Sequence, residues 1–170
     1  MTDTEQTDDS RTWKNYIPLM VLLALCALGA SAVSFYEGAD QGISRWMHLF
    51  MGFFLINFSM FKLFNIPGFA DGFQMYDLLA KRFRLYGFVY PFLELGLGLA
   101  YLSQIALVPT YILTIVLMSF GALGVFVALK KKLDINCACM GTVLDVPLST
   151  VAVLEDLGMT AMAIVMLLMR

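Results

Sequence analysis

The sequence predicts an all-α integral membrane protein, a bundle of four to five transmembrane helices with an amphipathic interfacial helix between spans two and three. Two compositional observations and one pattern lead to this fold class: 60% of the 170 residues are hydrophobic, only 14% are charged, and several stretches of about twenty residues carry almost no charge. A soluble domain is typically about 45–50% apolar and about 25% charged. Since the chain has too few charges to cover a globule in water, much of its surface must face a lipid bilayer.

The composition also excludes several other classes of protein. Eleven basic against thirteen acidic residues give a net charge of −2, which provides no positive field for nucleic acid. Three cysteines are too few for a disulfide framework, and the apolar content excludes a disordered chain. Residues 2–9 are acidic and lack the basic start of a secretory leader, so we expect the first apolar stretch to remain as a membrane span.

Five apolar stretches approach the length needed to cross a membrane. A bilayer core about 30 Å thick requires about 20 residues of helix, because every backbone polar group must be bonded inside the segment. The predicted organisation is an acidic tail, 1–15, and a single domain, 16–169, with spans at about 16–36, 46–66, 86–107, 110–129 and 148–169. The fifth span is the weakest because it contains Glu155 and Asp156.

The basic residues predict the orientation, since cytoplasmic loops near helix ends accumulate Lys and Arg. With five spans, the N-terminal tail and the loops after spans two and four share one side. Eight of the eleven basic residues fall on that side: Arg11, Lys14, Lys81, Arg82, Arg84, Lys130, Lys131 and Lys132. We therefore expect a multi-pass protein of the bacterial inner (cytoplasmic) membrane, with its N-terminus cytoplasmic and its C-terminus outside.

The region between spans two and three has helical periodicity. Its apolar positions are Phe73, Tyr76, Ala80 and Phe83, and its polar positions are Asp77, Lys81 and Arg84. This pattern predicts a helix that lies in the lipid headgroup layer and begins at Asp71 as its N-cap.

Two cysteines one residue apart, Cys137 and Cys139, are the most informative motif for chemistry. Thiolates are the nucleophiles of disulfide exchange, and a disulfide between these two would be strained and suited to passing on oxidising equivalents. Alternatively, Met140 could supply a third sulfur ligand in a site that favours Cu(I). The alternative without a chemical function is that the cysteines are inert packing groups.

Glu94 is an ionisable group at membrane depth and shares a helical face with Pro91, Gly98 and Tyr101. Such groups are costly in a bilayer and indicate function by default. Glu94 could have a proton-related or quinone-related role, or could form a structural hydrogen bond between helices. Its candidate partners are Lys62, Tyr101 and His48. Glu155 and Asp156 diverge by about 100° on a helix, so at most one of them can face Glu94.

Other sulfur and imidazole groups in the spans have a packing interpretation and a functional one. Cys26, near the middle of span one, is expected to be a small packing group rather than a relay partner for the other cysteines. Met47, His48 and Met51 could be secondary copper ligands, but methionines in an apolar chain usually fill irregular interfaces.

The chain resembles the MauE/DoxX-type redox-associated membrane proteins over roughly residues 15–169. The segments that carry the resemblance are Cys137-Ala138-Cys139-Met140-Gly141, Gly68 to Arg82, and Tyr90 to Gly96. Met140 replaces an aromatic residue that is usual in the family motif. The resemblance implies that Cys137 and Cys139 are a redox pair, and that Pro91 and Glu94 belong to the signature of the third span.

The resemblance also implies a function: thiol-disulfide exchange with a thioredoxin-like or client protein, in support of its processing, transport or maturation. In the family, the client is the β-subunit of methylamine dehydrogenase. A Cu(I)-binding membrane protein and a purely structural assembly partner are the alternatives. Apart from Cu(I) in the first alternative, the sequence specifies no cofactor, and it leaves the involvement of a quinone open. The predicted orientation places the Cys137–Cys139 motif at the reducing cytoplasmic face. Disulfides form in client proteins on the opposite, oxidising side of the membrane, so the orientation conflicts with a role in disulfide donation.

Overall fold

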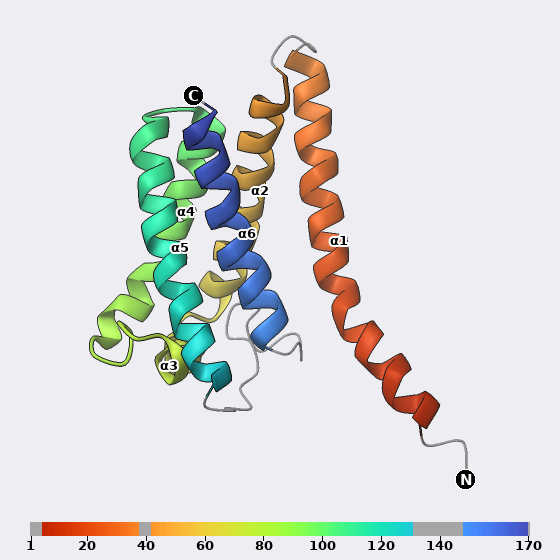
Figure 1. Cartoon of the computed structure of the whole chain (residues 1–170), viewed down its shortest axis with the longest axis vertical. Helices are drawn as coiled ribbons and strands as arrows, with labels where there is room; N and C mark the ends of the chain where they lie inside the picture. The colour runs from red at the N-terminus through yellow and green to blue at the C-terminus, as the bar shows by residue number, and fades with distance from the viewer. Residues whose placement is uncertain (1–4, 38–41, 131–147, 170) are drawn as a thin grey trace.

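A computed structural model of the chain describes residues 5–37, 42–130 and 148–169, and contains no strand in those ranges (Figure 1). Its helices are α1 (Glu5–Glu37), α2 (Gly42–Phe64), α3 (Ile66–Tyr76), α4 (Arg84–Ser103), α5 (Leu107–Lys130) and α6 (Leu148–Leu168). The prediction of an all-α membrane protein is confirmed.

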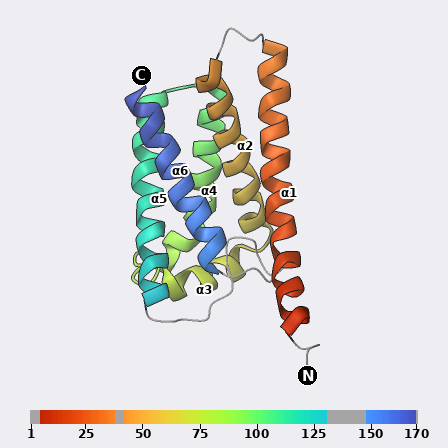
Figure 2. The ribbon, with the colours of Figure 1, turned by 45° about the vertical axis from the view of Figure 1, so that its right-hand side comes forward.

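Four of these helices are long and apolar enough to cross a membrane among the described residues. The qualifying segments are Ile17–Tyr36, Gly42–Phe64, Arg84–Ser103 and Leu107–Ala128. Between the last two, Gln104 and Ala106 adopt positive φ angles of 55° and 51°, which end one helix and reverse the chain. α6 runs alongside α5 in both ribbon views, and its role as a fifth span stays a prediction (Figures 1 and 2).

The helices α2, α4, α5 and α6 form a bundle, and α1 packs against α2 at its edge (Figure 2). The main pairs are α2 with α4 and α5 with α6. α3 lies at one end of the bundle, called the α3 end below, where α1 and α6 begin and α5 ends (Figure 1). The start of α1, the turn between α3 and α4 and the end of α5 therefore lie at the same end of the bundle.

Two glycines allow α2 and α4 to approach closely. A Cβ on Gly98 would lie 3.1 Å from the backbone oxygen of Gly52, and a Cβ on Gly52 would lie 3.0 Å from that of Gly98. Membrane helices lack a strong hydrophobic force between them and associate through such contacts of small residues. The contact brings the buried faces of α2 and α4 together.

The predicted N-cap of the interfacial helix is wrong. α3 begins at Ile66, and its cap is Asn65, whose Oδ1 accepts a hydrogen bond from the backbone N–H of Gly68 at 3.1 Å. Asn and Asp are both good caps, so the choice between them depended on where the chain leaves α2. Asp71 instead lies exposed within α3 and forms an ion pair with Arg84 at 2.6 Å.

Asp77, which the sequence places on the polar side of the interfacial helix, has a buried side chain at the end of α3. Its Oδ1 accepts hydrogen bonds from the backbone N–H groups of Leu79 and Ala80, both at 2.8 Å. This local bonding favours a turn over continued helix, so the helix stops at Tyr76 and α4 begins at Arg84. Burial raises the pKa of Asp77, although the two backbone hydrogen bonds oppose that shift.

Substitution of Gly98 tests the close contact of α2 with α4. Gly98→Ala is expected to lower the unfolding midpoint at a cost of about 1–3 kcal/mol, because the new Cβ would meet backbone atoms of Gly52 and Ile56. The matched control is Gly96→Ala on the same helix, where a Cβ meets no atom within 4 Å. The measurement is thermal unfolding in detergent, followed by circular dichroism. Equal midpoints for the two variants would contradict the assignment.

Candidate functional site: a buried ion cluster

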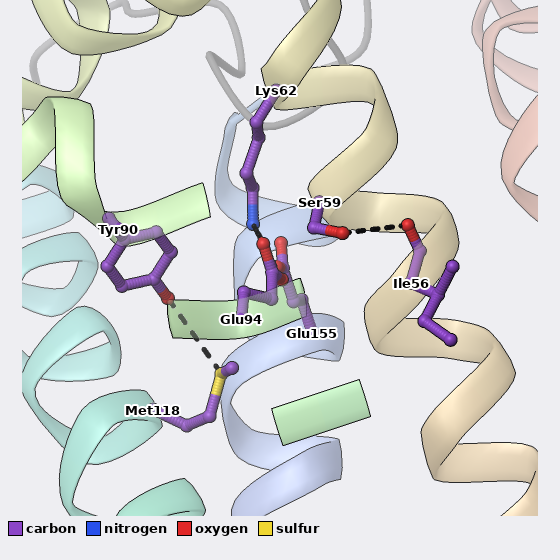
Figure 3. Close-up of polar contacts among 7 residues, drawn as sticks. All are labelled: Ile56, Ser59, Lys62, Tyr90, Glu94, Met118 and Glu155. Atoms are coloured by element: carbon purple, nitrogen blue, oxygen red, sulfur yellow. Dashed lines mark hydrogen bonds and ion pairs between the residues drawn. The ribbon is translucent and has the colours of Figure 1, made fainter. Parts of the chain in front are cut away.

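Glu94 lies in a cluster of charged groups from three helices (Figure 3). The Nζ of Lys62 on α2 donates to Oε1 and Oε2 of Glu94 on α4 at 2.8 and 2.7 Å. It also donates to Oε1 of Glu155 on α6 at 2.5 Å. Lys62 and Glu155 are each 2% exposed and Glu94 is fully buried. The prediction of Lys62 as a partner of Glu94 is confirmed.

The other two predicted partners of Glu94 are wrong. The hydroxyl of Tyr101 donates to Oγ1 of Thr114 at 3.0 Å, and the Nε2 of His48 is hydrogen-bonded to the hydroxyl of Tyr111. Tyr101 follows Glu94 by about two helical turns, so this second polar group lies farther from the α3 end. Tyr101 and Glu94 share a helical face but lie at different depths along α4, so the shared face did not make Tyr101 a partner of Glu94.

Sequence reasoning did not name Glu155 as a partner of Glu94. The angular argument correctly allowed one of the two adjacent acids to face Glu94, but it could not choose between them. The neighbouring acid, Asp156, is also buried, and its carboxylate packs against Gly121 of α5. A Cβ on Gly121 would lie 2.7 Å from Oδ2 of Asp156, so a glycine is needed there.

Aromatic rings surround the ammonium group of Lys62. Its Nζ lies 5.1 Å from the ring centroid of Tyr90, 5.7 Å from that of Phe69 and 5.8 Å from that of Phe58. These rings come from α4, α3 and α2. Cations are attracted to ring faces at such distances. The rings also keep water away from the cluster, so its electrostatic interactions act in an environment of low dielectric constant.

The geometry uses the full hydrogen-bonding capacity of the lysine. An ammonium group has three donors, and Lys62 makes three contacts with carboxylate oxygens. Removing charges from water costs several kcal/mol per ion, and good geometry with opposite charges is needed to offset that cost. The cluster can therefore hold α2, α4 and α6 in one arrangement, and it concentrates two carboxyl groups at a single cation.

The predicted cysteine site, Cys137 and Cys139 with Met140, lies outside the described residues. The helices that flank it in the sequence, α5 and α6, are packed against each other. α5 ends at Lys130 and α6 begins at Leu148, both at the α3 end (Figure 1).

The other sulfur and imidazole groups considered as candidate relay or copper-binding residues are buried or partly buried. Cys26 is buried in the core and its Sγ accepts a contact from Nδ2 of Asn57 at 3.7 Å. Met47, His48 and Met51 lie near the start of α2, whereas the helix ends flanking the cysteine site lie at the α3 end. The described part of the chain contains no group of three or more His, Cys, Asp or Glu side chains that could hold a metal ion.

Comparison with known proteins identifies one family. The model of the family described as methylamine utilisation protein MauE matches residues 40–169. That range includes the buried ion cluster and both cysteines of the predicted redox motif. No curated protein and no solved structure matches the chain.

Removal of the lysine charge tests the energetic role of the cluster. Lys62→Met is expected to destabilise the protein by about 3–5 kcal/mol at neutral pH, because two buried carboxyl groups lose their cation. The loss should shrink as the pH falls, because buried carboxyl groups without a cation must take up protons on folding, and the free-energy cost of that uptake decreases with pH. The control is Arg84→Gln, which breaks the exposed pair with Asp71 and should cost less than about 1 kcal/mol. Thermal unfolding across a pH series measures both, and similar losses in the two variants would contradict the assignment.

Proposed function

This chain belongs to the MauE family, and we propose that it uses Cys137 and Cys139 in thiol-disulfide exchange that supports processing, transport or maturation of a partner protein. Membership of the family supports a role in methylamine utilisation. The observation that carries the proposal is the family match over residues 40–169, which includes both cysteines. The partner would be a thioredoxin-like protein or a client such as the β-subunit of methylamine dehydrogenase.

The proposed chemistry needs only the two sulfurs and a partner dithiol. A thiolate of the partner attacks the Cys137–Cys139 disulfide, giving a mixed disulfide and one free thiol in the motif. The second partner thiolate then resolves the mixed disulfide, so the partner is oxidised by two electrons and the motif is reduced to two thiols. The reverse sequence reduces the partner and oxidises the motif.

The charges at the α3 end favour thiol reactivity. Lys81, Arg82, Arg84 and Lys130 are exposed in this part of the structure, and Lys131 and Lys132 follow in the sequence. Nearby cations lower the pKa of a cysteine and increase its thiolate fraction. Because α5 and α6 pack together, the segment with the cysteines is tethered at both ends to the same bundle.

The proposed location is the bacterial inner membrane, with the N-terminus and the α3 end in the cytoplasm. The support for this orientation is the concentration of Lys and Arg at the α3 end. Four crossings return the chain to its starting side, so Cys137 and Cys139 would face the cytoplasm whether or not α6 crosses. On that reducing side, a thioredoxin-like protein is a suitable exchange partner.

Cysteine labelling tests this location. A membrane-impermeant maleimide should fail to label Cys137 and Cys139 in intact spheroplasts and should label them in inverted vesicles. Cys26 is buried and should stay unlabelled in both preparations of the folded protein. Labelling in intact spheroplasts would overturn the orientation and would place the motif on the oxidising side.

Serine substitution tests the redox role. Cys137→Ser and Cys139→Ser are each expected to abolish partner maturation, and Cys139→Ser should accumulate a mixed disulfide that is visible on non-reducing gels. The control is Cys26→Ala, which removes the buried thiol of α1 and should leave maturation intact. Normal maturation in both serine variants would contradict the proposal.

Metal analysis in the same experiment separates the copper alternative. Purified protein that binds Cu(I) in a manner dependent on Cys137, Cys139 and Met140, with maturation unaffected by their loss, would favour copper binding. If neither maturation nor metal content depends on the cysteines, a structural assembly role would replace both interpretations.

A further inference from the structure

We infer that Lys62, Glu94 and Glu155 form a proton-binding site, in which the two carboxyl groups together hold one proton beside the lysine ammonium. This inference is independent of the proposed cysteine chemistry, because it rests only on side chains of α2, α4 and α6.

The charge count is the first argument. The ion pairs within this cluster give two carboxyl groups one cation, so full ionisation would leave a net charge of −1. All three side chains are almost completely inaccessible to solvent, with exposed fractions of 0–3%. An isolated charge in such a medium is so costly that a titratable group neutralises instead. One bound proton makes the cluster neutral.

The placement of the two carboxyl groups also favours a shared proton. Both lie on the same side of the lysine Nζ (Figure 3), and that one nitrogen is 2.7 Å from Oε2 of Glu94 and 2.5 Å from Oε1 of Glu155. An ionised carboxylate can only accept hydrogen bonds, so two carboxyl groups can bond to each other only when one carries a proton. Two carboxyl groups that share a site commonly retain one proton in this way.

Neutral and acidic side chains of α2, α4 and α6 lie near the cluster, and the two hydroxyl groups among them donate to other acceptors. α4 contributes Tyr90, whose hydroxyl donates to Sδ of Met118 on α5 at 3.9 Å, and α6 contributes the acidic Asp156. On α2, Ser59 donates to the backbone oxygen of Ile56 (Figure 3).

The neighbours of the cluster on α3 and at the start of α4 are aromatic rings. α3 presents the uncharged ring of Phe69. Also on α4, Tyr86 lies next to Tyr90, with ring centroids 5.8 Å apart. Among the described residues, Asp156 of α6 and Asp77 of the turn before α4 are further buried acids, and negative groups oppose a second ionised carboxylate.

The site couples proton binding to the position of α6. α6 packs mainly on α5, and Glu155 is its ion-pair link to α2 among the described residues. Loss of the proton would place two adjacent carboxylates, which repel each other, where α4 and α6 meet the lysine of α2. Glu155 lies about two turns from the start of α6, the helix that follows the cysteine segment.

Infrared spectroscopy of the full-length protein in lipid nanodiscs tests the inference. At neutral pH the wild type should show a protonated carboxyl C=O band that shifts in D₂O. The band should be lost in Glu94→Gln and in Glu155→Gln, because each variant leaves one carboxylate opposite one ammonium and needs no proton. The control is Asp71→Asn, which changes an exposed carboxylate and should leave the band unaltered.

A further variant tests the charge count directly. Lys62→Met removes the cation, so both carboxyl groups should be protonated and the band intensity should rise about twofold. If that variant fails to fold, the wild-type and glutamine spectra still decide the question. Absence of the band from the wild type at neutral pH would overturn the inference. So would a band that persists in both glutamine variants, and its loss in Asp77→Asn would then locate the proton at Asp77.

Discussion

The pairing of one buried lysine with two buried carboxyl groups is the constraint on which the bundle depends. Lys62, Glu94 and Glu155 come from three helices that are distant in the sequence. Their hydrogen bonds fix the relative depth and rotation of those helices, because a shift of one turn would leave a charge without its partner. An apolar contact has no comparable directionality. The cluster therefore specifies one arrangement among the many that apolar helices could adopt.

Small residues make this arrangement sterically possible. Gly52 and Gly98 permit close contact of α2 and α4, and Gly121 leaves space for the carboxylate of Asp156. In a bilayer, lipid chains are as apolar as leucine, so helix association relies on tight packing and polar contacts. The glycine contacts therefore support the ion cluster, because they bring the helices close together and shorten the distance that the charged side chains must span.

The two ends of the bundle have different polar chemistry. The α3 end combines the ion cluster, an aromatic wall and exposed basic residues. Farther from that end, hydroxyl and imidazole groups join helices through Tyr101 with Thr114 and Tyr111 with His48. The α3 end is also where α5 ends and α6 begins, so the sequence motif assigned to thiol chemistry is attached to the charged end. Membership of the MauE family associates a protein with this organisation with methylamine utilisation.

The sequence by itself determined the membrane fold and the family, and it placed Lys62 among three candidate partners of Glu94. These followed from composition, from motif order, and from the physical requirement that a carboxylate at membrane depth needs a partner. Only the tertiary structure decided that Glu155 completes the cluster, that Asn65 rather than Asp71 caps α3, and that Asp77 is buried. Periodicity defines the faces of one helix, but helix depth and the choice of neighbours arise from contacts between segments that are far apart in the chain.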